Sequence, residues 1–336
     1  MLAIGAGRAV PPVTPLCTPS EPELTELSGL VADGQRWFAV ADGGQRLEVF
    51  VLDPTSCAVD DVITAGVNPY DIEDLALAAD GALWLADTGD NDLDRETVAL
   101  HRLTRDGEAT LFRLVYPDGP HDAEALLLDR AGVPYVVTKE ALGAAGVYRP
   151  AGTLAAPGPT PLQRVASVRL GPTDTAGGPV GSVGSTLVTG AATSADGDVL
   201  AVRTYTDAYL YAVGEGDVAT ALERAPVRAP VRVPLPGEPQ GEAVALAPDG
   251  TLLSASEGAA GPAPIRAVRG ATTLVTPPAG SVAPAPAGPV GDGPPGVGGD
   301  PGGDAADGGL PAWQGAVLAV AVATVLVAVS GRRRRT

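Results

Sequence analysis

The chain has 336 residues, of which 22 are basic and 40 are acidic, so its formal net charge is −18 at pH 7. A surface this acidic repels nucleic acid and anionic lipid head groups, which excludes nucleic-acid binding as a function. It attracts cations or basic partners, or it serves only to keep the protein soluble.

The N-terminal segment, residues 1–14, is mildly apolar but lacks the basic start and the apolar core of a complete signal peptide. We interpret it as the remnant of a truncated signal, with a start site further upstream as the alternative. Cys17 and Cys57 are the two cysteines of the chain. An even number of cysteines in an exported protein predicts a disulfide between them, and two buried thiols are the alternative.

Residues 15–275 contain a repeat that predicts an all-β propeller. Each copy joins a short apolar strand, a turn that usually carries Asp-Gly, and a second apolar strand; the copies begin at Ser28, Glu73, Glu124, Gly190 and Glu242. Their spacing of 45 to 66 residues fits one four-stranded blade per repeat. We expect about five blades, or six if the two ends of the domain form one more. A β-sandwich would not explain the period.

The C-terminal part predicts a membrane anchor. Residues 276–311 are rich in Pro, Gly and Ala, a composition typical of a flexible linker. Residues 312–331 carry no charge and are long enough to cross a bilayer as one helix. The basic tail, residues 332–336, favours the cytoplasmic side, so we expect the propeller to be extracellular on a single-pass membrane protein. A cell-wall sorting signal is the alternative, although Trp313 and Gln314 do not fit it.

One face of the expected propeller gathers most of the polar residues. The links that enter the first strand of each blade and the loops that leave the second strand share that face. They carry Asp42, Asp71, Glu73, Asp74, Asp87, Asp90, Asn91, Asp92, Asp94, His121, Asp122, Glu124, Lys139, Glu140, Arg203, Tyr205, Asp207, Gln240, Glu242 and Glu257. The candidate catalytic residues are Glu73, Glu124, Glu242 and His121. The candidate ligand-binding residues are Lys139, Glu140, Arg203 and Tyr205.

Clustered carboxylates raise one another's pKa or bind a metal, and calcium is the cation that many oxygen ligands favour. The loop from Asp87 to Asp94 places Asp90, Asp92 and Asp94 at alternate positions, as at the start of a calcium loop. The rest of that motif is missing, and a polar loop capped by its own aspartates is the alternative. We therefore regard calcium as a candidate cofactor, with Asp87, Asp90, Asp92 and Asp94 as candidate ligands.

Several segments carry a family resemblance. They are DIEDLALAADGALWLADTGDN, YPDGPHDAEALLLDRAGVPYVVTKE, VLAVRTYTDAYLYAV and EPQGEAVALAPDGTLLSASEG. They resemble uncharacterised secreted or membrane-anchored β-propellers of actinobacteria and, more distantly, phytase-like esterase propellers. The resemblance covers about residues 24–258 and implies the fold and the exported location. It implies no reaction, because a calcium-dependent phytase would need more basic phosphate-holding residues than Lys139 and Arg203.

Two functions remain as hypotheses. The first is a surface-displayed module that binds an extracellular ligand or protein and is not an enzyme. The second is a metal-assisted hydrolase of esters or phosphoesters, in which Lys139 and Arg203 hold an anion and the glutamates hold metal or act as base. The sequence names neither the substrate nor the partner.

Overall fold

The computed structural model describes residues 9–141, 144–214, 216–223 and 229–275, and these residues form an all-β protein. The strands are β1 (Thr14–Cys17), β2 (Leu27–Ala32), β3 (Trp37–Ala41), β4 (Leu47–Leu52), β5 (Val59–Ala65), β6 (Ile72–Leu77), β7 (Leu83–Asp87), β8 (Val98–Leu103), β9 (Ala109–Val115), β10 (Ala123–Leu128), β11 (Pro134–Thr138), β12 (Ala145–Pro150), β13 (Thr160–Val168), β14 (Val188–Thr193), β15 (Val199–Thr204), β16 (Asp207–Ala212), β17 (Val231–Pro234), β18 (Gln240–Leu246), β19 (Leu252–Glu257) and β20 (Ile265–Val268). The helical elements are η1 (Pro22–Glu26), η2 (Gly181–Thr186), α1 (Val218–Glu223) and η3 (Ala271–Leu274).

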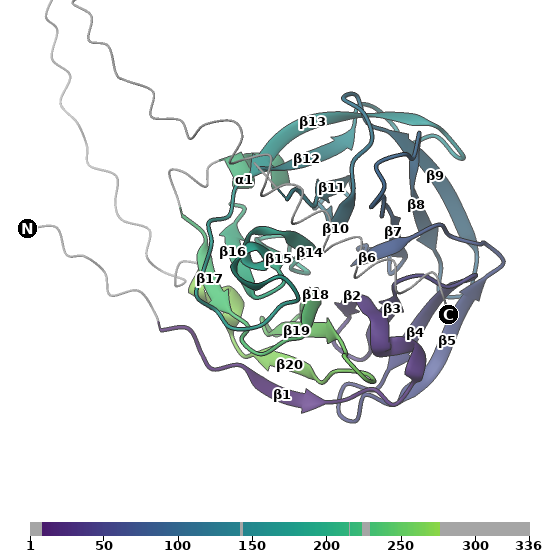
Figure 1. The fold of residues 1–336 in the computed structure, drawn as a ribbon. Coiled ribbons are helices and arrows are strands. Elements are labelled where there is room, and N and C mark those ends of the chain that lie inside the picture. The colour runs from purple at the N-terminus through teal and green to yellow at the C-terminus, as the bar shows by residue number, and fades with distance from the viewer. Residues whose placement is uncertain (1–8, 142–143, 215, 224–228, 276–336) are drawn as a thin grey trace, which may run out of the picture.

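The strands form antiparallel meanders arranged around a central axis, which is the architecture of a β-propeller (Figure 1). Three sheets have four strands, in the orders β2-β3-β4-β5, β14-β15-β16-β17 and β1-β20-β19-β18. The fourth has eight, in the order β10-β11-β12-β13-β9-β8-β7-β6, because β13 pairs with β9 in parallel over two residues of each strand. The first strands β2, β6, β10, β14 and β18 contact one another in a closed ring.

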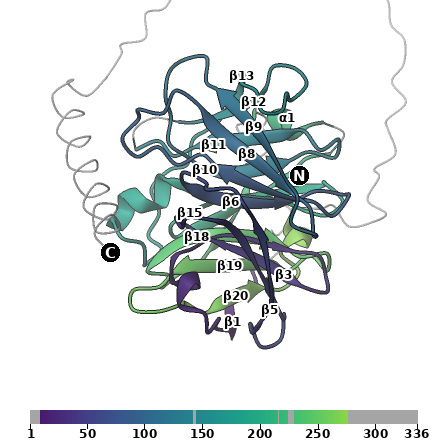
Figure 2. The same ribbon diagram turned by 90° about the vertical axis from the view of Figure 1, so that its right-hand side faces the viewer.

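The N-terminal strand completes the last sheet. β1 pairs with β20, so one sheet contains residues from both ends of the described chain, and Figure 2 shows β1 beside β20. The predicted disulfide is confirmed: Cys17 in β1 is bonded to Cys57, which lies between β4 and β5. The first sheet is thereby tied covalently to the last, and the ring is held closed at the point where the chain enters it.

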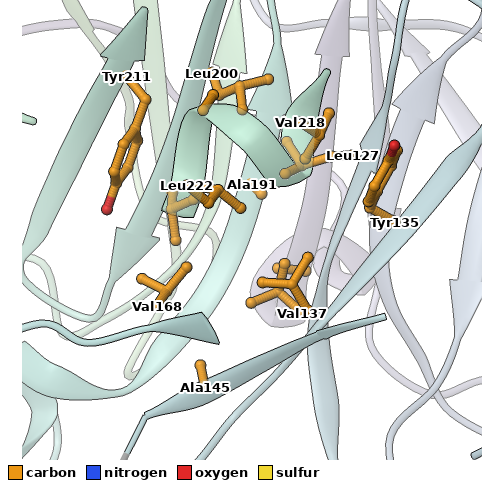
Figure 3. Close-up of a cluster of buried hydrophobic side chains, with 14 of the residues drawn as sticks. Leu127, Tyr135, Val137, Ala145, Val168, Ala191, Leu200, Tyr211, Val218 and Leu222 are labelled. Carbon is orange, nitrogen blue, oxygen red and sulfur yellow. The ribbon is translucent and has the colours of Figure 1, made fainter. Parts of the chain in front are cut away.

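Burial follows position in the sheets. All residues of β2 and β10 are buried, whereas most residues of the outer strands β5 and β9 are exposed or half-buried. This gradient explains why the first strands read as continuous apolar runs and the outer strands as mixed ones. Apolar side chains fill the space between neighbouring sheets. In one such cluster α1 packs Val218 and Leu222 against residues of β10 to β15 (Figure 3).

The Asp-Gly pairs lie in the turns between the first and second strands, as expected for structural turns. Gly81 and Gly250 have φ of 84° and 80°, which a glycine adopts without the strain that a Cβ would cause. The turns from every repeat surround a cavity of about 790 Å³, whose lining includes Trp84, Arg102 and Arg130. This cavity lies at the end of the axis opposite to the loops with the candidate site residues.

Within the described ranges, no helix has the length and the apolar character needed to cross a membrane. The predicted linker, residues 276–311, the predicted membrane helix, residues 312–331, and the basic tail, residues 332–336, lie outside the described residues. So do residues 1–8 of the N-terminal segment.

Candidate functional site

A register shift in the first strand of every repeat determines which side chains face the axis. The shift falls at Ser28 in β2, Glu73 in β6, Glu124 in β10, Thr189 in β14 and Glu242–Ala243 in β18. A bulge leaves one residue unpaired and turns its side chain away from the regular alternation. The equivalent residue of the fourth repeat is thus Thr189 and not Gly190, one residue earlier than the sequence alignment placed it.

The two hydroxyl residues of this set bridge neighbouring strands. Ser28 Oγ donates to the carbonyl of Glu73 at 2.5 Å, and Thr189 Oγ1 donates to the carbonyl of Gly241 at 2.8 Å. The glutamates instead interact electrostatically: among charged groups, Glu124 has the largest effect in raising the pKa of both Glu73 and Glu242. The structure therefore brings Glu73, Glu124 and Glu242 together at one end of the axis, which we call the carboxylate mouth.

Aspartates from the adjoining loops complete the mouth. Asp42 follows β3, while Asp71 and Asp122 precede β6 and β10. Carboxylate oxygens of Asp42, Asp71 and Glu73 lie within 4.8 Å of one another, and so do those of Glu73, Asp122 and Glu124. Both groups could hold a metal ion, because hard divalent cations prefer several oxygen ligands at short range.

One buried oxygen of this cluster has no hydrogen-bond partner among the described residues. Glu124 is 4% exposed, and its Oε2 makes no hydrogen bond to any of the described residues. Its Oε1 is paired with the ammonium of Lys139. A buried oxygen without a donor costs free energy, and a bound cation would remove that cost.

Lys139 lies inside the mouth. It follows β11, its side chain is 6% exposed, and its Nζ is 5.2 Å from the centre of the Tyr205 ring. Burial alone would lower the pKa of this lysine, but the carboxylate of Glu124, followed by Tyr205 and Glu242, raises its pKa well above the ordinary value. Lys139 and Tyr205, both predicted to bind ligand, thus contact each other.

The carboxyl groups of the mouth have raised pKa values. Burial, followed by repulsion from Glu124, raises the pKa of Glu73 and of Glu242 well above the ordinary value. Burial also raises the pKa of Glu124 to about 7 and that of Glu257 to about 8. The mouth is therefore charged incompletely near neutral pH, and a divalent cation would compete with protons for it.

Gln240 organises the side of the mouth formed by β18 and β19. Its amide nitrogen donates to Glu242 Oε1 at 3.0 Å and to Glu257 Oε1 at 2.7 Å. These two acids consequently have a protein donor, unlike Oε2 of Glu124.

His121 lies beside the mouth in a second polar cluster. Its Nε2 is 3.1 Å from Asp118 Oδ1, and its Nδ1 is 3.3 Å from Glu140 Oε1. Tyr148 donates its hydroxyl to Asp118 Oδ2 at 2.8 Å. His121 and Glu140, both candidates from the sequence, are therefore paired with each other, with the imidazole side chain 21% exposed.

Arg203 does not point into the mouth. Its guanidinium is fully buried and donates to Glu238 Oε2 at 2.6 Å and to the carbonyls of Ala243 and Ala255. It joins β15 to β18 and β19.

The Asp87–Asp94 loop is organised by internal contacts. Asp87 pairs with Arg95 at 2.9 Å and with the Nε2 of His101 at 3.1 Å. Asp90 accepts the backbone N–H groups of Asp94 and Arg95, while Asp92 and Asp94 are exposed. Among the described residues, the groups with metal-ligand spacing are those of the mouth and do not include these four aspartates.

Asp74 has a role that the sequence did not indicate. It is fully buried next to Glu73, and its carboxylate accepts backbone N–H groups from Leu75, Leu126 and Ala191. One side chain thus links β6, β10 and β14 directly beneath the mouth. Burial raises its pKa well above the ordinary value, against the effect of these hydrogen bonds.

Comparisons with known proteins found no matching family model and no matching curated protein. Among solved structures, a luciferin-regenerating enzyme is similar with a TM-score of 0.47 and 14% identity, over 78% of this chain and 96% of that one. A gluconolactonase from Xanthomonas campestris gives 0.42 and 18%, over 76% and 83%. A putative gluconolactonase gives 0.41 and 17%, over 72% and 73%. At these scores the similarity assigns no activity to this chain.

Proposed function

We propose that the chain is a metal-dependent hydrolase of esters or phosphoesters, built on a five-bladed propeller with its metal at the carboxylate mouth. The observation that carries the proposal is the convergence of Glu73, Asp122 and Glu124 with Oε2 of Glu124 buried and unpartnered among the described residues. Calcium is the expected ion, because the available ligands are all carboxylate oxygens.

The residues have distinct tasks in this account. Glu73, Asp122 and Glu124 would hold the ion, which when bound polarises a carbonyl or phosphoryl oxygen. Asp118 and Glu140 orient the imidazole of His121 at the rim, from which it can move a proton to or from a bound substrate. The proposed count of five blades is supported by five meanders of four strands, in which β1 supplies the outermost strand of the last.

The test combines binding with turnover. Purified full-length chain is titrated with calcium chloride by calorimetry and is then assayed on generic aryl esters and aryl phosphates with calcium or with chelator. We expect binding and calcium-dependent turnover in the wild type, both lost in Glu124→Gln. Glu96→Gln, at an exposed position, is the matched control and should leave both unchanged. Turnover that persists in chelator would contradict the proposal.

The second candidate function is a ligand- or protein-binding module. The cavity of about 790 Å³ at the other end of the axis favours it, because a pocket of this size suits a small molecule. Calcium binding without turnover of any ester or phosphate would favour this alternative over hydrolysis.

The proposed location of the protein at the cell surface rests on the sequence. We propose that residues 15–275 are displayed outside the cell, that residues 276–311 are a linker, and that residues 312–331 cross the membrane once. The charge-free apolar segment followed by four arginines supports this orientation.

A further inference from the structure

The single lysine of the chain is placed where a cation would bind. Lys139 lies at the end of β11, and its backbone N–H donates to the carbonyl of Asp122 at 2.9 Å, which fixes the start of the side chain. The side chain then extends among carboxylates, where Nζ pairs with Glu124 Oε1. Both side chains are more than nine-tenths buried, at 6% and 5% exposed. An ammonium that is this well enclosed is a permanent part of the mouth.

The carboxylates divide into two groups around this ammonium. Glu242 and Glu257 share the amide of Gln240, and Glu242 and Tyr205 are both electrostatic partners of Lys139. Glu73, Asp122 and Glu124 form a group whose carboxylate oxygens lie within 4.8 Å of one another, and Oε2 of Glu124 has no hydrogen bond within the described part of the chain. Glu124 belongs to both groups, and its Oε1 is the oxygen that pairs with the ammonium.

We propose that the mouth contains two cation positions and that Lys139 permanently fills one of them, so that a single divalent ion binds at the other. This inference rests on the proposed function, because the free position is the metal site described above. The filled position is bounded by Glu124 Oε1, Glu242 and the face of Tyr205, which attracts a cation through its ring electrons. Lys139 thus determines how many metal ions the mouth takes.

Removing the ammonium should open the second position. Methionine matches the length of the lysine stem without its charge, so Lys139→Met leaves Glu124 and Glu242 together without a cation. Oxygen ligands in that arrangement bind calcium, whereas Lys139→Arg keeps the charge and should keep the position closed. Lys139→Gln is a second neutral variant in case the methionine variant does not fold.

The experiment is calcium titration calorimetry on the full-length chain and its variants, with circular dichroism as the check of folding. We expect about one calcium ion per chain in the wild type and in Lys139→Arg, and about two in Lys139→Met or Lys139→Gln. The additional Glu242→Gln change should abolish the second event. In the background that retains Lys139, the exposed-site control Glu96→Gln should alter the calcium Kd by less than about threefold.

Each result decides a separate point. If the wild type binds calcium and the neutral variants bind the same number of ions, the lysine does not fill a cation position and this inference is wrong, while the proposed function stands. A tighter single event without a second one also overturns it. If the wild type binds nothing and the neutral variants bind one ion, Lys139 fills a cation position as inferred, but the free position and the proposed metal site are both wrong. If none of them binds calcium, both are wrong.

Discussion

At the scale of single residues, buried acids dominate the behaviour of this protein. Glu73, Glu124, Glu242 and Glu257 would each be ionised in an unfolded chain at pH 7, yet burial raises the pKa of each of them in the fold. Folding at neutral pH therefore takes up protons or leaves buried negative charge. A single lysine among them neutralises one charge, and the remainder is available to a metal.

The first prediction concerns Glu257, whose pKa rises from 4.5 to about 8. Because the folded state favours the protonated acid, the free energy of unfolding should be highest near pH 5 and fall as the pH rises toward 8. Glu257→Gln should reduce this fall by on the order of 1–3 kcal/mol, as followed by urea unfolding in chelator. Glu96→Gln is the control, and an unchanged pH profile in Glu257→Gln would contradict the prediction.

The second prediction concerns Arg203, which the sequence placed among ligand-binding residues and the structure places in a buried ion pair with Glu238. Arg203→Met leaves Glu238 with Arg266 alone and should lower the free energy of unfolding by about 3–5 kcal/mol. Arg36→Met is the control, since the side chains of Arg36 and of its partner Asp60 are 47% and 41% exposed. Loss of calcium binding with unchanged stability would instead place Arg203 at the site.

At the scale of elements, the strand pattern and the Asp-Gly turns were readable from the sequence because both depend on local periodicity and backbone chemistry. The position of Glu73 and Glu124 was readable for the same reason. Thr189 was missed because a bulge shifts the register by one residue, which alternation does not reveal. The burial of Arg203 depends on contacts with the neighbouring sheet. Asp87 pairs with Arg95, and strand alternation does not reveal such a contact between side chains of one loop.

The third prediction concerns the covalent closure of the ring. The Cys17–Cys57 disulfide closes a loop with a sequence separation of 40, and its loss in a Cys17→Ser, Cys57→Ser variant should cost about 3–4 kcal/mol of unfolding free energy. The measurement is urea unfolding of the wild type and of this variant. Equal midpoints would show that the pairing of β1 with β20 holds the ring without the disulfide.

At the scale of the whole molecule, the two ends of the axis are different. One end is the carboxylate mouth, and the other is the cavity bounded by the Asp-Gly turns. The described chain ends at η3, where Thr272 donates its N–H to the carbonyl of Gly250 in one of those turns. The last described residues therefore lie at the cavity end of the axis.

The fourth prediction tests the anchor. Deleting residues 313–336, with a working signal peptide supplied, should release the protein from the membrane fraction into the medium, because the charge-free segment and its arginines are removed. The measurement is immunoblotting of membrane and medium fractions. Replacing the four arginines alone is the comparison, and a truncated protein that still sediments with membranes would refute the anchor.

The measurement that tests the central claim most directly is the melting temperature of the full-length chain with and without calcium. An ion that binds only the native state stabilises that state, so calcium should raise the melting temperature of the wild type and of Glu96→Gln. It should leave that of Glu124→Gln unchanged, because this variant loses the carboxylate whose Oε2 lacks a partner among the described residues. An equal rise in all three proteins, or a rise in none of them, would contradict a metal site at the carboxylate mouth.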